Sequence, residues 1–245
     1  MIGDLFHTLL TQPLFNALVF LFNTVAFGDI GVAIVLLTII IRLILWPLSH
    51  KAIKAQRDLQ ELQPKIKEIQ KKYPNKEEQA KALMQLYQTH KVNPFGGCLP
   101  ILVQLPILIA LYSVFLNGLK PEYLVNLYSF VANPGTLNPS FLGLIDLASR
   151  SVALALLAGI LQFIQAKMAL PKVKLEGAPK RSDEAIAQMV SKQTLYVLPV
   201  ITVVISIGLP AGLPLYWATT TLFTIFQQLV IMRSYNGKGN DQSNN

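Results

Sequence analysis

The sequence contains little charge, one cysteine and three histidines. Charged residues make up 14% of the 245 residues, whereas an average soluble domain carries about a quarter, and 52% of the residues are hydrophobic. A single cysteine cannot form an internal disulfide bond or a cysteine-based metal cage, and the histidines lie far apart with no HExxH pair. The sequence therefore predicts neither a disulfide scaffold, nor a metal site, nor a bound cofactor.

One stretch of the chain lacks lysine and arginine, and two others lack charge altogether. No lysine or arginine precedes Arg42, and because a signal peptide needs a cationic start, we expect the N-terminus to be retained. Residues 92–119 and 193–232 contain no charged side chain at all. About 20 apolar residues suffice to cross a bilayer, so these tracts exclude an ordinary soluble domain and predict a polytopic membrane protein.

The apolar tracts predict an all-α fold with five transmembrane helices. We expect these helices at residues 30–49, 93–119, 141–166, 193–209 and 214–232. Residues 1–29 alternate apolar and polar groups at helical spacing, with Pro13 breaking or restarting the helix, and predict an amphipathic helix in the membrane interface. Loops at 120–140 and 167–192 and a tail at 233–245 complete the chain.

Residues 50–92 are rich in charge and predict a water-exposed helical hairpin. Apolar residues from Ala52 to Tyr73 follow the alternating three- and four-residue spacing of a coiled-coil seam. Pro64 should bend the first arm, and Tyr73-Pro74-Asn75 is a turn signal.

The distribution of lysine and arginine predicts the orientation. Residues 50–92, the loop at 167–192 and the tail hold 18 of the 21 lysines and arginines. Short loops rich in these residues stay in the cytoplasm, so we expect the N-terminus outside and the C-terminus inside. An odd number of spans fits this orientation.

Arg42 is the most unusual residue because it lies within a predicted span. Such a charge costs about 2.5–3.5 kcal/mol at mid-membrane. The intramembrane acid, Asp146, should lie near the outer end of its span and has a nearer partner in Arg150 at i+4. We therefore expect Arg42 to face a wet cavity, with Thr38 one turn before it on the same face.

Other polar side chains in the spans could line the same cavity. They are Gln104, Gln162, Gln165, Gln227 and Gln228, with Tyr216 and Trp217 as aromatic candidates. Each glutamine alone is more often a hydrogen-bonding link between helices, and the two aromatic residues could equally lie in a lipid belt. Gathered around an arginine, they predict a hydrophilic groove.

Enzymatic chemistry has no support in the sequence. It contains no paired intramembrane aspartates, no GxSxG and no phosphate-binding loop. The residues leave open an anion or small-solute transporter that uses Arg42, and a scaffold for the assembly of other membrane proteins.

Three ordered motifs resemble the YidC family of membrane protein insertases, in a short form without the large extracytoplasmic domain. The first is NPFGGCLPILVQLP at 93–106. The second is TIIIR at 38–42 followed by WPL at 46–48, and the third is PAGLPLYW at 210–217 with FQQ at 226–228. The resemblance covers nearly the whole chain.

The resemblance implies a chaperone-like insertase in a bacterial plasma membrane, with a groove open to the cytoplasm and to lipid. Arg42 matches the groove arginine, and Thr38, Gln104 and Trp217 match groove positions. The clients would be nascent membrane proteins with few spans. The implied partners are the Sec translocon, the signal-recognition targeting machinery, the ribosome and anionic lipids, but not DNA. The hairpin would dock partners through Lys54, Arg57, Lys65, Lys67, Lys71, Lys72 and Lys76.

Overall fold

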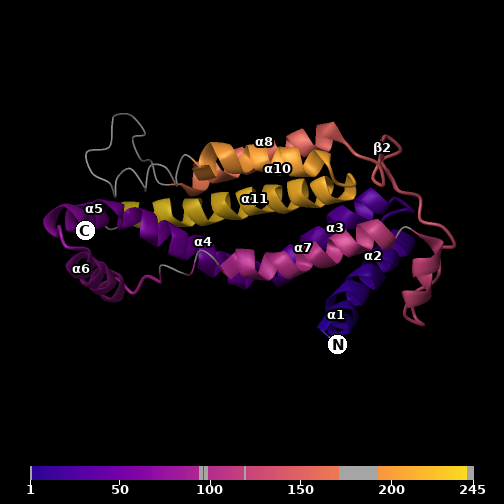
Figure 1. The fold of residues 1–245 in the computed structure, drawn as a ribbon, viewed down its shortest axis with the longest axis horizontal. Helices are drawn as coiled ribbons and strands as arrows, with labels where there is room; N and C mark the ends of the chain where they lie inside the picture. The colour runs from indigo at the N-terminus through magenta and orange to yellow at the C-terminus, as the bar shows by residue number, and fades with distance from the viewer. Residues whose placement is uncertain (1, 94–95, 97–98, 119, 171–192, 242–245) are drawn as a thin grey trace. The chain divides into compact units, whose positions relative to one another are not determined.

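The structure is a computed structural model that describes residues 2–93, 96, 99–118, 120–170 and 193–241. These residues are mostly helical, as Figure 1 shows. They divide into two compact units. The first comprises Met1–Leu45, Ile101–Gln162 and Pro199–Thr224, and the second comprises Trp46–Pro100, Phe163–Leu198 and Ile225–Asn245.

The first unit begins with a nearly continuous helix made of α1 (Ile2–Phe6), the π-helical turn η1 (His7–Thr11) and α2 (Gln12–Thr24). Pro13 occupies one of the first two positions of α2, where its missing N–H interrupts no bond of that helix. The wide turn before it accommodates the proline ring, so the helix restarts without a gap.

Helix α3 (Ile30–Ile44) packs against α2 in the first unit, as both ribbon views show. Asp29 caps α3, because its carboxylate accepts a hydrogen bond from the Val32 N–H at 2.9 Å. The face of α3 that carries Ile30, Ala33, Ile34 and Leu37 is buried in the main apolar core. The contact between α2 and α3 is thus part of that core.

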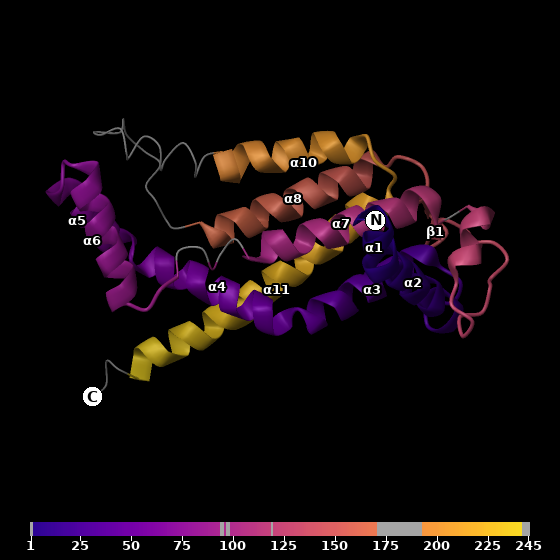
Figure 2. The ribbon, with the colours of Figure 1, turned by 60° about the horizontal axis from the view of Figure 1, so that its bottom comes forward.

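The remaining helices of the first unit are α7 (Leu99–Asn117), α8 (Val152–Ala169), α10 (Leu198–Ile207) and α11 (Gly212–Asp241), and the last residues of α8 and α11 extend into the second unit. Helices α8 and α10 lie side by side (Figure 2). Gly159 permits this approach, because a Cβ there would lie 2.3 Å from Val203. Two short segments complete the fold, the 3₁₀ helix η3 (Pro121–Asn126) and the π turn η4 (Gln193–Val197).

The connection between α7 and α8 differs from the sequence prediction. Strands β1 (Ser140–Phe141) and β2 (Ile145–Asp146) form a small antiparallel hairpin, and α8 begins only at Val152. The predicted span at 141–166 therefore starts about ten residues too early. Leu142 and Gly143 at positive φ make the hairpin turn, which a helix could not contain. Asp146 and Arg150 are exposed outside the helix, so the helical i,i+4 argument for pairing them is wrong.

The second unit contains α4 (Trp46–Glu61), α5 (Gln63–Lys72) and α6 (Lys76–Thr89). Helices α5 and α6 pack against each other and are joined through Tyr73, Pro74 and Asn75 (Figure 2). Pro64 follows the break between α4 and α5 and lies in the first turn of α5. Asn75 caps α6 by accepting a hydrogen bond from the Glu77 N–H.

Several helices are long and apolar enough to cross a membrane. In the described part of the chain these are Gly3–Thr24, Val152–Ala169 and Gly212–Arg233, with a fourth if Ile30–Ile44 and Trp46–Glu61 form one broken span. Leu102–Asn117 and Gln193–Ile207 are apolar but shorter. The five-span count stays a prediction, as does the interfacial position of residues 1–29, because that segment also has the length and hydropathy of a span.

Candidate functional site

Arg42 lies in the last turn of α3 and is buried, with 9% of its surface exposed. The carbonyl groups at the C-terminal end of a helix carry partial negative charge, which favours a cation at this position. Among the described residues, however, no carboxylate forms an ion pair with Arg42. Its guanidinium group is therefore a buried charge without a carboxylate partner in the part of the chain that the structure describes.

Tyr216 and Gln104 form the polar surroundings of Arg42 in the first unit. Tyr216 lies in α11, is almost completely buried and lies close to Arg42. The amide of Gln104, from α7, donates a hydrogen bond to the Tyr216 hydroxyl. Three helices thus contribute one polar side chain each to a single group, which we call the Arg42 site: Arg42, Gln104 and Tyr216.

The Arg42 site can bind an anion. Arg42 offers several N–H donors in a fixed planar arrangement, which matches the two oxygens of a carboxylate. Apolar side chains of the main core surround Tyr216, and in such an environment an attraction between opposite charges exceeds its value in water. The site lacks the nucleophile and base pair of a hydrolytic enzyme, and the described residues contain no group of three or more potential metal ligands.

Thr38 and Trp217 belong to the same unit as the Arg42 site. Thr38 is buried one turn before Arg42, and its hydroxyl donates to the Ile34 carbonyl at 2.6 Å. Its only proton is thus engaged by its own helix, and its oxygen remains available as an acceptor. Trp217 is half-buried next to Tyr216.

The predicted glutamines fall into both units. Gln162 belongs to the first, and its buried Oε1 has no hydrogen-bond partner among the described residues. Gln165 and Gln228 belong to the second unit, so their membership of a groove around Arg42 stays a prediction. Gln228 is 4% exposed, and its Oε1 likewise has no partner in the described part of the chain.

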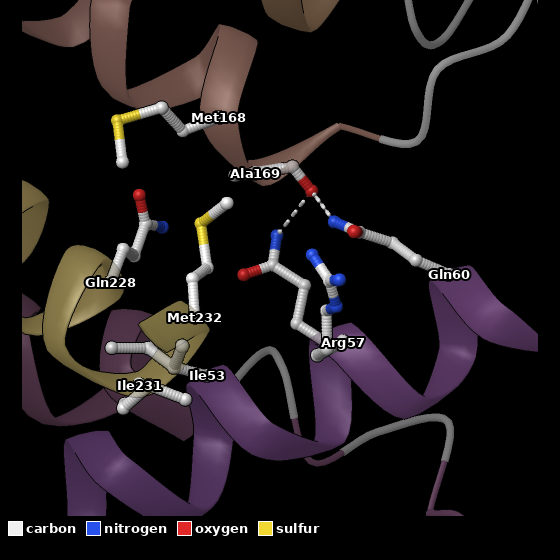
Figure 3. A pocket seen from close by; sticks show the side chains of 9 residues that line it. Ile53, Arg57, Gln60, Met168, Ala169, Gln228, Ile231 and Met232 are labelled. Carbon is white, nitrogen blue, oxygen red and sulfur yellow. Dashed lines mark hydrogen bonds between the residues drawn. The ribbon is translucent and has the colours of Figure 1, made fainter. Parts of the chain in front are cut away.

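Gln228 lines a small cavity inside the second unit, which Figure 3 shows. The cavity has a volume of about 20 Å³, which suits one water molecule but not a peptide. It is lined by Ile53, Gln56, Arg57, Gln60, Met168, Ala169, Gln228, Ile231 and Met232. The amides of Gln56 and Gln60 both donate to the Ala169 carbonyl and thereby fasten the end of α8 to α4.

Most of the predicted docking cations are exposed. Lys54, Lys65, Lys67, Lys71, Lys72 and Lys76 all have exposed side chains. Arg57 is the exception, because it is half-buried beside the cavity and forms an ion pair with Glu61 at 3.5 Å. It is therefore a poorer candidate for partner docking than the six lysines.

Of two further buried polar residues, Gln227 was predicted as a possible groove residue, whereas Asn16 was not singled out from the sequence. Gln227 is completely buried, and neither side-chain polar atom has a partner among the described residues. Asn16 is buried in α2 and bonds to the connection between α7 and α8. The sequence could have revealed Asn16 as a polar residue on the apolar face of a predicted helix, next to the core residue Phe15.

Comparison with protein families gives a match over most of the chain. The family model described as "60Kd inner membrane protein" matches residues 20–238. A relative from Fusobacterium nucleatum named "Membrane protein insertase YidC" is 39% identical over 219 residues, which cover 88% of this chain and 93% of the relative. A relative of the same name from Geobacter sulfurreducens is 34% identical over 92% of this chain, which spans only 38% of that relative's length.

A solved structure gives the same assignment. The chain resembles the "Active YidC insertase crystal structure with the first transmembrane domain resolved" with a TM-score of 0.55 and 31% identity. The similarity covers 89% of this chain and 45% of the other. Together with several apolar helices, these matches indicate a multi-pass bacterial membrane protein. The chain belongs to the 60Kd inner membrane protein family, which includes the YidC membrane protein insertases.

Proposed function

We propose that this protein inserts membrane proteins, and that the Arg42 site captures the short polar tail of a client while its apolar segment enters the bilayer. The observation that carries this proposal is a buried arginine without a carboxylate partner in the described residues, set beside Tyr216 and Gln104. A buried ion pair would serve structure, whereas an uncompensated cation attracts an external anion.

Acidic tails are the clients that this arrangement favours. A carboxylate would replace the missing counter-ion of Arg42, and Gln104 and Tyr216 could supply further hydrogen bonds. Release remains possible because water can solvate the guanidinium again. The apolar segment would then move into lipid because its transfer from water is favourable. No nucleotide or cofactor takes part in these steps.

The charged hairpin α5–α6 would recruit clients and partners. Its exposed lysines suit anionic lipid headgroups, and the same charges could contact the Sec translocon, the targeting machinery or the ribosome. The distribution of lysine and arginine supports a cytoplasmic hairpin, an external N-terminus and a cytoplasmic C-terminus.

Insertion into liposomes tests the proposal. The client is a single-span protein with a short acidic tail, and protease protection measures its insertion with wild type, Arg42→Ala, Arg42→Lys and empty vesicles. We expect insertion by wild type and a marked loss in Arg42→Ala. Partial activity of Arg42→Lys would indicate that charge suffices, and its absence that the planar geometry of arginine is required.

Arg150→Ala is the matched control, because Arg150 is exposed outside the helices and should not affect insertion. Equal insertion by wild type and Arg42→Ala would support the insertase function but overturn the proposed role of Arg42. No insertion above empty vesicles would overturn the function itself.

A further inference from the structure

The connection between α7 and α8 is fastened to the first unit by specific hydrogen bonds. We call residues 122–149 the strap. Leu124, Val131, Leu137 and Leu147 of the strap are buried in the same apolar cluster as Tyr216. The strap is therefore a layer of the core rather than a free loop.

Asn16 is the main polar anchor of the strap. Its amide donates to the Asn126 carbonyl at 3.0 Å and to the Gln12 carbonyl at 2.9 Å. Its Oδ1 accepts from the Tyr128 N–H at 2.6 Å. Asn16 is 3% exposed, so losing it would leave the Tyr128 N–H without its partner in an apolar environment, which is costly.

Two further hydrogen bonds join the N-terminal helix to the strap, one on each side of Asn16 in the sequence. Near its beginning, His7 hydrogen-bonds to the Tyr123 hydroxyl at 3.0 Å. Near its end, the Asn23 amide donates to the Ala132 carbonyl at 2.7 Å. Asn16 lies between these two contacts, and its burial makes it the anchor that water can least replace.

The strap then covers the beginning of α3. The Asp29 carboxylate accepts from the Leu142 N–H at 2.6 Å while it caps α3. Phe141 packs so closely on Gly31 that a Cβ there would lie 2.2 Å from the ring. Arg42 lies 13 residues after Asp29 along the same helix, which corresponds to about 20 Å. The strap and the Arg42 site thus lie at opposite ends of α3.

We propose that Asn16 is a positioning residue that holds the strap in place over the beginning of α3, so that the buried face of α3 between the strap and Arg42 is kept from water on the extracytoplasmic side. The purpose of this seal rests on the proposed insertase function, because a polar site that captures tails from one side must not open to the other. The sealing itself can be measured without insertion.

Sided labelling of a buried cysteine tests the seal. The background variant carries Cys98→Ser and Ala33→Cys, because Ala33 is completely buried one turn after Asp29. Right-side-out membrane vesicles are exposed to an impermeant maleimide. We expect slow labelling with Asn16 intact and a rate about 10- to 100-fold higher in Asn16→Ala, since the closed strap loses several buried hydrogen bonds.

Thr24→Ala is the matched control on the same helix. Thr24 is exposed and its hydroxyl bonds only within α2, to the Phe20 carbonyl, so labelling should stay at the wild-type rate. If Asn16→Ala does not fold, Asn16→Asp replaces it. The aspartate keeps an acceptor for the Tyr128 N–H but turns a buried carboxylate toward the Gln12 and Asn126 carbonyl oxygens, so labelling should again be faster than in the parent.

The proposal is overturned if folded Asn16→Ala is labelled as slowly as the parent, or if Thr24→Ala is labelled equally fast. Ser129→Cys, in the exposed part of the strap, should be labelled rapidly in every variant. Slow labelling there would contradict the orientation in the proposed function, and a lack of client insertion would contradict the insertase. Both failures are distinct from failure of the seal.

Discussion

Helices α2 and α3 both bury a polar side chain, but the two side chains differ in their partners. On α2, the amide of Asn16 uses its donor group and its acceptor in bonds to backbone atoms. On α3, Arg42 is nearly as buried but pairs with no carboxylate among the described residues. A satisfied buried amide stabilises one conformation, whereas a buried charge without a carboxylate partner costs free energy and can serve to bind an anion.

The contrast predicts opposite effects on stability and activity. Removing a satisfied group should destabilise the fold, because its partners lose their bonds. Removing an uncompensated charge should leave the fold intact or stabilise it, and should cost activity instead.

Asn16→Ala should have the largest effect on stability. We expect the free energy of unfolding to fall by about 2–3 kcal/mol, because several buried hydrogen bonds are lost together. Thermal unfolding in detergent, followed by circular dichroism, measures this change. An effect no larger than that of Thr24→Ala would remove the distinction between the two regions.

Gly31→Ala tests the packing of the strap on α3. The new Cβ would collide with Phe141, and we expect a loss of about 1–3 kcal/mol of unfolding free energy despite the better helix propensity of alanine. The same measurement on Gly3→Ala is the control, because no atom lies within 4 Å of a Cβ at Gly3. Adding Phe141→Ala to Gly31→Ala should relieve the collision, and a failure to do so would contradict this contact.

Arg42→Ala should lower the insertion rate of an acidic-tailed client about tenfold, which corresponds to about 1.4 kcal/mol. The free energy of unfolding should stay unchanged or rise by about 1 kcal/mol, because a buried charge is removed. Liposome insertion and thermal unfolding of the same preparation give both values. A large loss of stability would show that Arg42 is a structural residue like Asn16.

Replacing Asp146 should have the smallest effect on the free energy of unfolding, and this effect depends on pH. The Ser149 hydroxyl and the Ala148 N–H stabilise its carboxylate and hold the pKa of Asp146 below its usual range. The carboxylate therefore stabilises the folded protein at neutral pH, and this contribution disappears as the pH falls below about 4. Because Asp146 is exposed, the contribution should be below about 0.5 kcal/mol.

Unfolding of wild type and Asp146→Asn at pH 7 and at pH 3 measures this contribution. Wild type should be slightly more stable at pH 7, and the two proteins should converge at pH 3. A difference that grows at low pH would contradict the assigned hydrogen bonds.

The apolar segments could be predicted because long uncharged tracts have few alternatives to membrane helices. Helices α3, α7, α8, α10 and α11 each overlap a predicted span. The beginning of the third span was misplaced, because the apolar residues of the strap resemble a helix in composition. Their burial depends on Asp29 and Asn16, which lie more than 100 residues away in the sequence.

The sequence by itself determined that the chain is a membrane protein of this family, and it predicted that Arg42 lies in an apolar segment without a nearby acid. Charge, hydropathy and motif order are properties of the chain that do not depend on how distant segments pack. The tertiary structure decided which buried polar side chains have hydrogen-bond partners. Only folding brings Gln104 to Tyr216 and Asn16 to Tyr128, because hydrogen bonds between distant segments depend on packing that no local pattern records.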